Sequence, residues 1–271
     1  NRGDTEPHLR AAGLAGVVQI ECLGVSSGRW RPRLEAASAR RGSRQVAIRP
    51  TAHSPVSCAP DLLLEALAGN PTGPAPTIHC DEDAADGLLL RERAGPWAPF
   101  HDRIGHDWRG GLGHGRSGVA VLDDLGLLRP ALGLVHLVHA DGRDLDRVAR
   151  SGATAILCPR SNQHIGGRLP DVAGMVARGI PLAIGTDSLA SSPDLDIVAE
   201  AATLRAAFPD LPCETWLSAL TTGGAALLGA TGAGALRPGT HPGLLHVGIP
   251  PVNDPLGVLL DGTRWPRSFL A

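Results

Sequence analysis

The sequence contains no lysine and no tyrosine, and aromatic residues make up only 3% of it. All 25 of its Lys and Arg residues are arginine, and with 35 Gly and 23 Pro this composition indicates GC-rich coding bias rather than a functional choice. The formal net charge of −2 gives no electrostatic reason to bind polyanions. We therefore expect neither nucleic acid nor a membrane surface as a partner.

Cysteine is scarce and scattered, and no Cys-x-x-Cys pair occurs. An odd, dispersed set argues against a disulfide framework and fits a reducing, cytoplasmic location; its members are Cys22, Cys58, Cys80, Cys158 and Cys213. Cys80 and Cys158 are expected to be small buried hydrophobic residues. No apolar run approaches the length that spans a membrane, and the first residues, which lack Met, resemble no signal peptide.

Several catalytic and nucleotide-binding motifs are also missing. The chain of 271 residues is long enough for one large α/β domain or two small ones. It has no Gly-x-Gly-x-x-Gly and no Gly-x-x-x-x-Gly-Lys-[Ser/Thr], which a nucleotide-binding doubly wound sheet usually carries on its first turn. Ser161 and Ser188 are nucleophiles in principle, but neither lies in Gly-x-Ser-x-Gly.

The most informative stretch runs from Leu134 to Ser188. Apolar runs at 133–139, 153–158 and 181–185 alternate with two helical patterns, which predicts a buried parallel sheet. Each run ends in polar residues: His136 and His139, then Arg160-Ser161-Asn162, then Thr186-Asp187-Ser188. In α/β barrels the chemistry occurs where strands lead into their loops, so this stretch is predicted to form an active-site rim.

The rest of the chain continues the alternation. Further strands are expected at 17–23, 46–48 and 76–79, giving six strand–helix units, with helices at 6–12, 32–41, 60–67, 84–94, 119–128, 195–207 and 213–228. The segment 95–117 is expected to be an irregular loop or lid with solvated histidines at 101, 106 and 114. The tail after 234 reads as short strands of a separate β layer. A six-stranded doubly wound sheet satisfies this count, and a barrel satisfies it better.

Histidines and carboxylates recur at the predicted strand ends, namely Glu21, His53, His79, Glu82, His136 and Asp187. Imidazole and carboxylate groups converging above a barrel suit a borderline metal ion such as Zn²⁺. Such an ion makes hydroxide available near neutral pH. Glu82, three residues beyond His79, would then shuttle protons between water and substrate.

Each of these residues also has a structural interpretation. A single strand-end histidine is more often hydrogen-bonded than metal-bound, and strand alternation places His139 on the face opposite His136. Glu82 could simply begin a helix, where the dipole favours an acid. Asp187 is the hardest to dismiss, because a carboxylate that ends an apolar strand needs a charged or hydrogen-bonding partner.

The motifs resemble the amidohydrolase superfamily, and most of all its metal-dependent deaminase and chlorohydrolase branch. The resemblance lies in His-Leu-Val-His at 136–139, Cys-Pro-Arg-Ser-Asn at 158–162, Gly-Thr-Asp-Ser at 185–188, His-Cys-Asp-Glu at 79–82, His-Ser-Pro-Val-Ser at 53–57 and Gly-Ala-Leu-Arg-Pro-Gly at 234–239. Glu21 and the runs at 122–128 and 188–196 are similar to aminodeoxyfutalosine deaminases of the menaquinone pathway.

The resemblance implies roles for individual residues. His79 and Asp187 would ligate Zn²⁺ or Fe²⁺, and Asp187 would also accept a proton from water. Glu82 would protonate a ring nitrogen, and His136 would hold the attacking water or polarise the target carbon. The substrate contacts implied are His53, Glu21, Ser161 and Asn162. The implied reaction is hydrolytic deamination of a small amino-substituted N-heterocycle resembling a purine nucleoside.

One part of the branch's pattern is missing, because no His-x-His occurs in the chain. We therefore expect residues 1–230 to form a (β/α)8 barrel that lacks its first two strands and two metal ligands, as in a fragment. Residues 231–271 would be the remnant of a small β-sandwich. The alternatives are a catalytically inactive barrel that serves as a binding or assembly module, a chlorohydrolase-type hydrolase, or a flavodoxin-like nucleotide binder. A homodimer is compatible with the barrel.

Overall fold

The computed structural model describes residues 4–68, 73–112, 115–230, 232–240 and 243–270. Strands and helices alternate along most of this part of the chain. The strands are β1 (Gly16–Cys22), β2 (Val46–Ala52), β3 (Thr77–Cys80), β4 (Gly133–His136), β5 (Thr154–Leu157), β6 (Leu182–Ile184), β7 (Leu244–Val247) and β8 (Arg267–Leu270). The helices up to β5 are α1 (Glu6–Ala11), α2 (Ser27–Ala39), α3 (Pro60–Leu67), α4 (Ala84–Glu92), α5 (Trp97–Arg103), α6 (Trp108–Gly111), α7 (Gly118–Asp124) and α8 (Gly142–Ser151). Those after β5 are α9 (Pro159–Gly166), α10 (Val172–Ala177), α11 (Ile197–Ala207), α12 (Cys213–Ser218), the π-helix η1 (Ala219–Gly223), α13 (Gly224–Leu227) and α14 (Pro255–Leu259).

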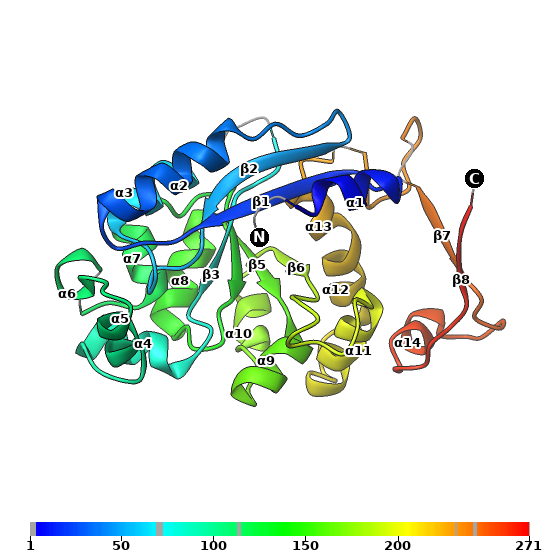
Figure 1. The fold of residues 1–271 in the computed structure, drawn as a ribbon. Coiled ribbons are helices and arrows are strands. Elements are labelled where there is room, and N and C mark those ends of the chain that lie inside the picture. Colours follow the sequence, from blue (N-terminus) through cyan, green and yellow to red (C-terminus); the bar gives the residue numbers. More distant parts are fainter. Residues whose placement is uncertain (1–3, 69–72, 113–114, 231, 241–242, 271) are drawn as a thin grey trace.

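The first six described strands are parallel and lie side by side in chain order. β1 pairs with β2, and β3, β4, β5 and β6 form a second sheet in that order. The two sheets meet where the amide of His79 donates to the carbonyl of His53 at 3.0 Å and the hydroxyl of Thr51 donates to the carbonyl of Thr77 at 2.7 Å. Helices α2 and α3 pack on β2, and α11 packs beside β6 (Figure 1). This arrangement is the TIM-barrel-like α/β fold that the sequence predicts.

The strands β3 to β6 are short, and most of their side chains are buried. Gly133, which opens β4, shows how closely they pack, since a Cβ there would lie 2.7 Å from Cδ1 of Ile156 and 3.0 Å from Cγ2 of Thr77. The main core contains the fully buried Trp30 and Trp216. The hydrophobic surface removed from water in this core is the main source of stability for the barrel wall.

The segment 95–117 is not the irregular loop that the sequence predicts, because it contains α5 and α6. The indole of Trp108 is buried in a small second core beside Leu89 and Leu90. His101 is only 4% exposed, and its Nδ1 lies 3.1 Å from Nδ1 of His106, so the prediction that His101 is solvated is wrong. His114 lies outside the described residues.

Two other elements differ from the sequence-based expectation. α2 begins at Ser27 instead of Pro32, and this longer helix buries Trp30 completely. The helix expected over 213–228 is divided into α12, η1 and α13. Gly223, in η1, lies against β6, where a Cβ would meet the carbonyl oxygen of Leu182 at 2.0 Å. This close approach of two backbones admits only glycine.

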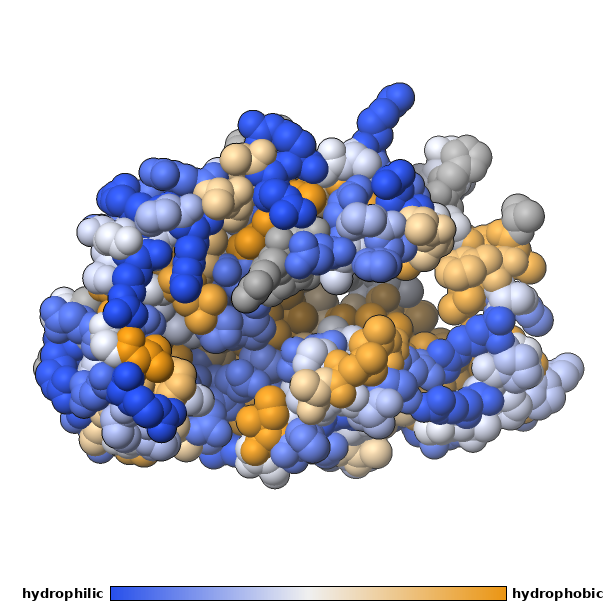
Figure 2. Space-filling view, viewed as in Figure 1, coloured by the Kyte–Doolittle hydropathy of each residue, from blue (hydrophilic) through white to orange (hydrophobic). Residues whose placement is uncertain are grey.

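The tail forms an antiparallel hairpin of β7 and β8, with α14 between them. Short strands were expected in the tail, whereas α14 was not. Leu245 pairs with Phe269, which is 81% exposed, and Figure 2 shows apolar side chains gathered on this hairpin at the right of the molecule. Arg267 ties β8 to the barrel through a 2.6 Å ion pair with Asp196. Within the described residues, no helix has the length and apolar character needed to cross a bilayer.

A large apolar hollow opens between β1 and the helices that follow β6 (Figure 2). Its volume is about 980 Å³, and its wall includes Ile156, Ile184, Leu220 and Leu227. β6 lines this hollow through Ala183 and Ile184, and neither β1 nor β6 pairs with a further strand on its outer side among the described residues. The barrel wall is therefore open between its first and last described parallel strands.

Candidate functional site

A polar pocket of about 380 Å³ lies at the carboxyl ends of the parallel strands. Five of the residues predicted from the sequence line it together: His53, His79, Glu82, His136 and Asp187. His79 lies in β3 and His136 ends β4, while His53, Glu82 and Asp187 follow β2, β3 and β6. Parallel strands bring their carboxyl ends to one edge of the sheet. The prediction that these strand ends form one rim agrees with this geometry.

The backbone turns sharply at the strand ends that carry the pocket residues. His136, Leu137 and Asp187 have φ values of 80°, 53° and 57°, and Asp81 beside Glu82 has a φ of 48°. Side chains other than glycine adopt these left-handed conformations rarely and at a cost of about 1–3 kcal/mol each. Backbone strain of this kind is concentrated at functional sites, and here it occurs after three strands that meet at the pocket.

Glu82, His136 and Asp187 form the tightest cluster in the pocket. One ligand atom from each lies within 4.8 Å of the others, and no other group of three potential metal ligands occurs among the described residues. Nε2 of His136 lies 3.4 Å from Oε1 of Glu82. An imidazole between two carboxylates is a donor set that suits a divalent cation of borderline softness.

His79 lies beside this cluster but is not one of its three members. Its ring is 5.4 Å from that of His136 and 5.0 Å from that of His53. Its Nδ1 lies 3.1 Å from the carbonyl oxygen of His53 and 3.7 Å from Oε1 of Glu21. The carbonyl oxygen can only accept, so Nδ1 of His79 carries the proton and donates this hydrogen bond. Nε2 of His79 is then left with its lone pair, as a metal ligand requires.

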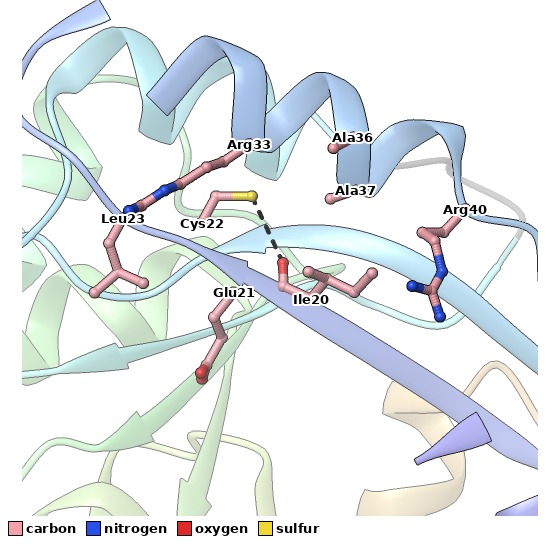
Figure 3. A pocket seen from close by; sticks show the side chains of 8 residues that line it. All are labelled: Ile20, Glu21, Cys22, Leu23, Arg33, Ala36, Ala37 and Arg40. Carbon is pink, nitrogen blue, oxygen red and sulfur yellow. Dashed lines mark hydrogen bonds between the residues drawn. The ribbon is translucent and has the colours of Figure 1, made fainter. Parts of the chain in front are cut away.

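Glu21 reaches the inner side of the barrel through the alternation of β1. Ile20 and Cys22 lie on the α2 side, near Ala37, in a separate pocket of about 570 Å³, and Glu21 points away from α2 (Figure 3). Its carboxylate therefore faces His79. The contact with His79 is observed, whereas the predicted contact with substrate stays a prediction.

His53 is held by two serines of its own loop. Its Nδ1 lies 2.8 Å from Oγ of Ser57 and 3.1 Å from Oγ of Ser54. Burial, reinforced by the nearby His79, lowers the pKa of His53. With Nδ1 occupied, Nε2 is the atom of this neutral ring that can meet a substrate in the pocket.

The protonation states of the central cluster are shifted in opposite directions. Burial, together with the charge of Asp187, raises the pKa of Glu82 to about 7. Burial, with the neighbouring His79, lowers the pKa of His136 to about 4. Burial alone would raise the pKa of Asp187, but hydrogen bonds such as that from Ser161 lower it below its usual value. Near pH 7 the pocket thus contains a half-protonated Glu82, a neutral His136 and an ionised Asp187.

Glu82 is not the first residue of a helix, although that was its structural interpretation. α4 begins at Ala84, and its N-cap is Asp83, whose side chain accepts from the amide of Ala85 at 2.7 Å. Asp86 completes a capping box by accepting from the amide of Asp83. Because Asp83 and Asp86 satisfy this helix end, capping does not require Glu82.

Ser161 and Asn162 are buried behind the pocket and are not part of its lining. The hydroxyl of Ser161 donates to Oδ2 of Asp187 at 2.6 Å, and Nδ2 of Asn162 lies 2.9 Å from Nδ1 of His136. Their exposed fractions are 0% and 2%. The observed contacts are with side chains of the site, and the predicted contact with substrate stays a prediction.

Sequence reasoning missed several residues that the structure brings to the site. His164 and Ile165 line the pocket, and Ser191 donates to Oδ2 of Asp187 at 3.1 Å. Nothing in the run after Asp187 singles out Ser191. Glu200 could have been recognised as a buried carboxylate, because it lies one helical turn from Leu204 and so on the apolar face of α11.

Comparisons with known proteins agree with this geometry. The sequence profile of the Amidohydrolase family matches residues 26–264. The chain is 31% identical over 235 residues to a 5-methylthioadenosine/S-adenosylhomocysteine deaminase of Syntrophobacter fumaroxidans, covering 81% of this chain and 48% of that protein. It is 37% identical over 111 residues to an aminodeoxyfutalosine deaminase of Deinococcus radiodurans, covering 41% of this chain and 27% of that protein.

A solved structure shows the same fold. The crystal structure of an adenosine deaminase from Xanthomonas campestris with bound zinc superposes with a TM-score of 0.72 at 22% identity. The superposition covers 96% of this chain and 59% of that one. The matches to the two curated deaminases cover 48% and 27% of those proteins, so the chain spans about half of their length or less.

Proposed function

The chain belongs to the amidohydrolase family, and from that premise we propose that the protein catalyses the hydrolytic deamination of an adenosine-like nucleoside. The observation that carries this proposal is the placement of Glu82, with its pKa raised to about 7, against His136 and Asp187 in one pocket. A carboxyl group poised near neutral pH is suited to deliver a proton to a heterocycle. The names of the relatives support a nucleoside substrate, with 5-methylthioadenosine, S-adenosylhomocysteine and aminodeoxyfutalosine as the specific candidates.

The residues present fit a divalent metal ion. Asp187 and His79 would hold it, beside Glu82 and His136, and Zn²⁺ and Fe²⁺ both suit this donor set. When bound, such an ion would lower the pKa of water towards neutrality and so supply a nucleophile. The zinc in the Xanthomonas campestris adenosine deaminase supports Zn²⁺ as the first candidate.

The side chains of the pocket divide the proton transfers between them. Asp187 is ionised and accepts a proton from the attacking water. Glu82, with its pKa near 7, is protonated in about half of the molecules at neutral pH, and the protonated form donates to a ring nitrogen of the substrate. The neutral ring of His136 orients the water or the target carbon. The water oxygen bonds to the carbon that bears the amino group. Asp187 then returns its proton to this amino group, the carbon–nitrogen bond breaks and ammonia leaves, and the hydroxyl proton of the intermediate returns to Glu82 as the carbonyl forms.

We further propose that two more strands complete the barrel between β6 and β1 and carry the remaining metal ligands. The open wall between these strands and the apolar hollow behind it support this proposal. So does the chain's coverage of only 48% of its Syntrophobacter relative. In the same way, the β7–β8 hairpin is proposed to be part of a small β-sandwich beginning near residue 231. A homodimer and a cytoplasmic location stay predictions.

Ammonia release tests the proposed function directly. The whole protein, loaded with Zn²⁺, would be incubated with adenosine, 5′-methylthioadenosine, S-adenosylhomocysteine and aminodeoxyfutalosine, and with a chlorinated triazine. We expect ammonia from at least one nucleoside and no chloride from the triazine. Chloride without ammonia would establish the chlorohydrolase alternative. Neither product, in a protein that also binds no Zn²⁺ or Fe²⁺, would support the inactive binding module.

A further inference from the structure

Glu200 is a fully buried carboxylate that lies outside the pocket, with an exposed fraction of 0%. It belongs to the first turn of α11 and accepts three hydrogen bonds. The backbone amide of Arg160 donates to it at 3.0 Å, Nε of Arg160 donates at 2.7 Å, and the hydroxyl of Ser192 donates at 3.2 Å. A buried charge is costly unless it is paired and hydrogen-bonded, so these bonds hold both partners firmly against α11.

The two partners of Glu200 flank two hydroxyls that bind Asp187. Ser161 follows Arg160 in the chain, and Ser191 precedes Ser192. Both hydroxyls donate to Oδ2 of Asp187, at 2.6 and 3.1 Å, and their oxygens lie 2.9 Å apart. One carboxylate oxygen is therefore occupied by two hydroxyls, one from the first turn of α9 and one from the loop after β6.

Arg160 strengthens the same connection from the loop after β6. Its Nη2 donates to Oδ1 of Asp194 at 2.8 Å and to the carbonyl of Asp196 at 3.2 Å. The loop from Asp187 to Asp196 is thus held at its middle by Ser192 and near its end by Arg160. Glu200 binds both of these side chains, so it joins the first turn of α9 to the loop after β6.

We propose that Glu200 is a positioning residue, which fixes the Ser161 and Ser191 hydroxyls so that the Asp187 carboxylate is aimed into the pocket. The inference rests on the proposed role of Asp187 as metal ligand and proton acceptor. Glu200 does not touch the pocket, and it acts only through residues 160 and 192. Outer partners that orient a ligand typically change metal affinity or activity by about 10- to 100-fold when they are removed.

A purely structural role for Glu200 makes a different prediction. Replacing a buried carboxylate that pairs with Arg160 destabilises the fold in either case. Only positioning also changes the metal site in molecules that remain folded. The discriminating measurements are therefore Zn²⁺ affinity by chelator competition and the visible absorption of the Co²⁺-substituted protein, made on folded protein.

The first experiment compares Glu200→Gln with Glu214→Gln in the whole protein. Glu214 is an exposed glutamate on α12, so its replacement controls for the loss of a carboxylate. We expect Glu200→Gln to weaken Zn²⁺ binding by about 10-fold or more, to shift the Co²⁺ spectrum, and to lower kcat with KM within about twofold. Glu214→Gln should match the wild type. Unchanged Zn²⁺ affinity and spectrum in folded Glu200→Gln would overturn the proposal.

A double-variant cycle tests the route through the hydroxyls. If Glu200 acts through Ser191, both changes release the Asp187 carboxylate by the same route. The double variant Glu200→Gln/Ser191→Ala should then bind Zn²⁺ no more weakly than whichever single variant binds it less tightly. Independent losses that multiply would contradict this route. If Glu200→Gln does not fold, Ser192→Ala removes only one of the three bonds, and we expect about a three- to tenfold weaker Zn²⁺ affinity. A Ser192→Ala protein with wild-type affinity would then overturn the proposal.

The two proposals fail in distinguishable ways. A wild type that binds Zn²⁺ but releases no ammonia, with weakened binding in Glu200→Gln, would refute the proposed deamination and leave the positioning role intact. A wild type that deaminates, with Zn²⁺ affinity and spectrum unchanged in Glu200→Gln, would refute only the positioning role. A wild type that binds no Zn²⁺ or Co²⁺ would overturn the positioning role whatever the ammonia assay gives.

Discussion

The side-chain amide of Asn162 determines which nitrogen of His136 carries the proton. Its Nδ2 lies 2.9 Å from Nδ1 of His136, and both side chains are buried. An amide nitrogen can only donate, so His136 accepts at Nδ1 and carries its own proton on Nε2, the atom 3.4 Å from Oε1 of Glu82. In this tautomer Nε2 of His136 is a hydrogen-bond donor to the pocket, so His136 could join Glu82 and Asp187 in binding a metal ion only after this proton moves.

We predict that Asn162→Asp reverses this tautomer, because a carboxylate accepts from Nδ1 and leaves the lone pair on Nε2. The nitrogen chemical shifts of His136 in labelled protein report the change directly. Asn162→Leu removes the partner, and we expect kcat to fall by about 10- to 100-fold. Identical His136 shifts in the wild type and Asn162→Asp would show that the amide does not set the tautomer.

Replacing Glu82 by Gln should abolish turnover while metal content is retained. Glutamine keeps the shape of the side chain but cannot donate a carboxyl proton, and general acid–base catalysis contributes about 10²- to 10⁴-fold. Ammonia release and metal analysis are measured on the same sample. Glu92→Gln, an exposed change on α4, the helix that follows Glu82, is the control. Loss of the metal from Glu82→Gln would instead make Glu82 a ligand or a structural residue.

The raised pKa of Glu82 has a consequence for stability in metal-free protein. The folded state holds this proton up to about pH 7, whereas the unfolded chain releases it near the usual glutamate pKa of 4.5, so stability falls as pH rises between these values. Glu82→Gln removes that loss. After discounting for the quarter of the side chain that is exposed, we expect the variant to be more stable than the wild type by about 1–2 kcal/mol at pH 8 and by much less at pH 5. Urea unfolding of the wild type and the variant, in the presence of a chelator, measures the stability difference at each pH. An equal difference at the two pH values would mean that Glu82 is not titrating.

Asp187→Ala should lose both metal and activity. The change removes the carboxylate and leaves Ser161 and Ser191 without their common acceptor. Asp210→Ala, an exposed change, should behave like the wild type. Metal content by elemental analysis and ammonia release are the readouts. An active Asp187→Ala protein that retains its metal would contradict the site described here.

The sequence predicted the pocket residues well because their positions follow from one geometric rule. Parallel strands deliver their carboxyl ends to one edge, and Glu82, His136 and Asp187 each follow a strand that is recognisable from its apolar run. The helix α3, which buries only its apolar face, was also predicted to begin at Pro60 and end at Leu67. Pro60 and the spacing of the apolar residues define both ends.

Other features depend on contacts between loops and could not be read from local patterns. Ser191 meets the site only when the loop after β6 folds against α9 and α11. Glu200 lies at helical spacing from the buried Leu204, but that spacing does not indicate that Glu200 bonds Arg160 and Ser192. The burial of His101 depends on Trp108 packing in a second core that a Gly-rich, polar segment did not indicate. Polar residues in a loop look solvated until the surface that covers them is known.

The left-handed backbone at His136 and Asp187 bears on whether this site is still in use. Glycine would adopt φ values of 80° and 57° without steric cost, so the chain gives up stability to keep an imidazole and a carboxylate there. A copy released from selection for chemistry would gain by drifting to glycine at both positions. Continued selection for the chemistry of the site would keep both side chains in place, even though they lower the stability of the fold.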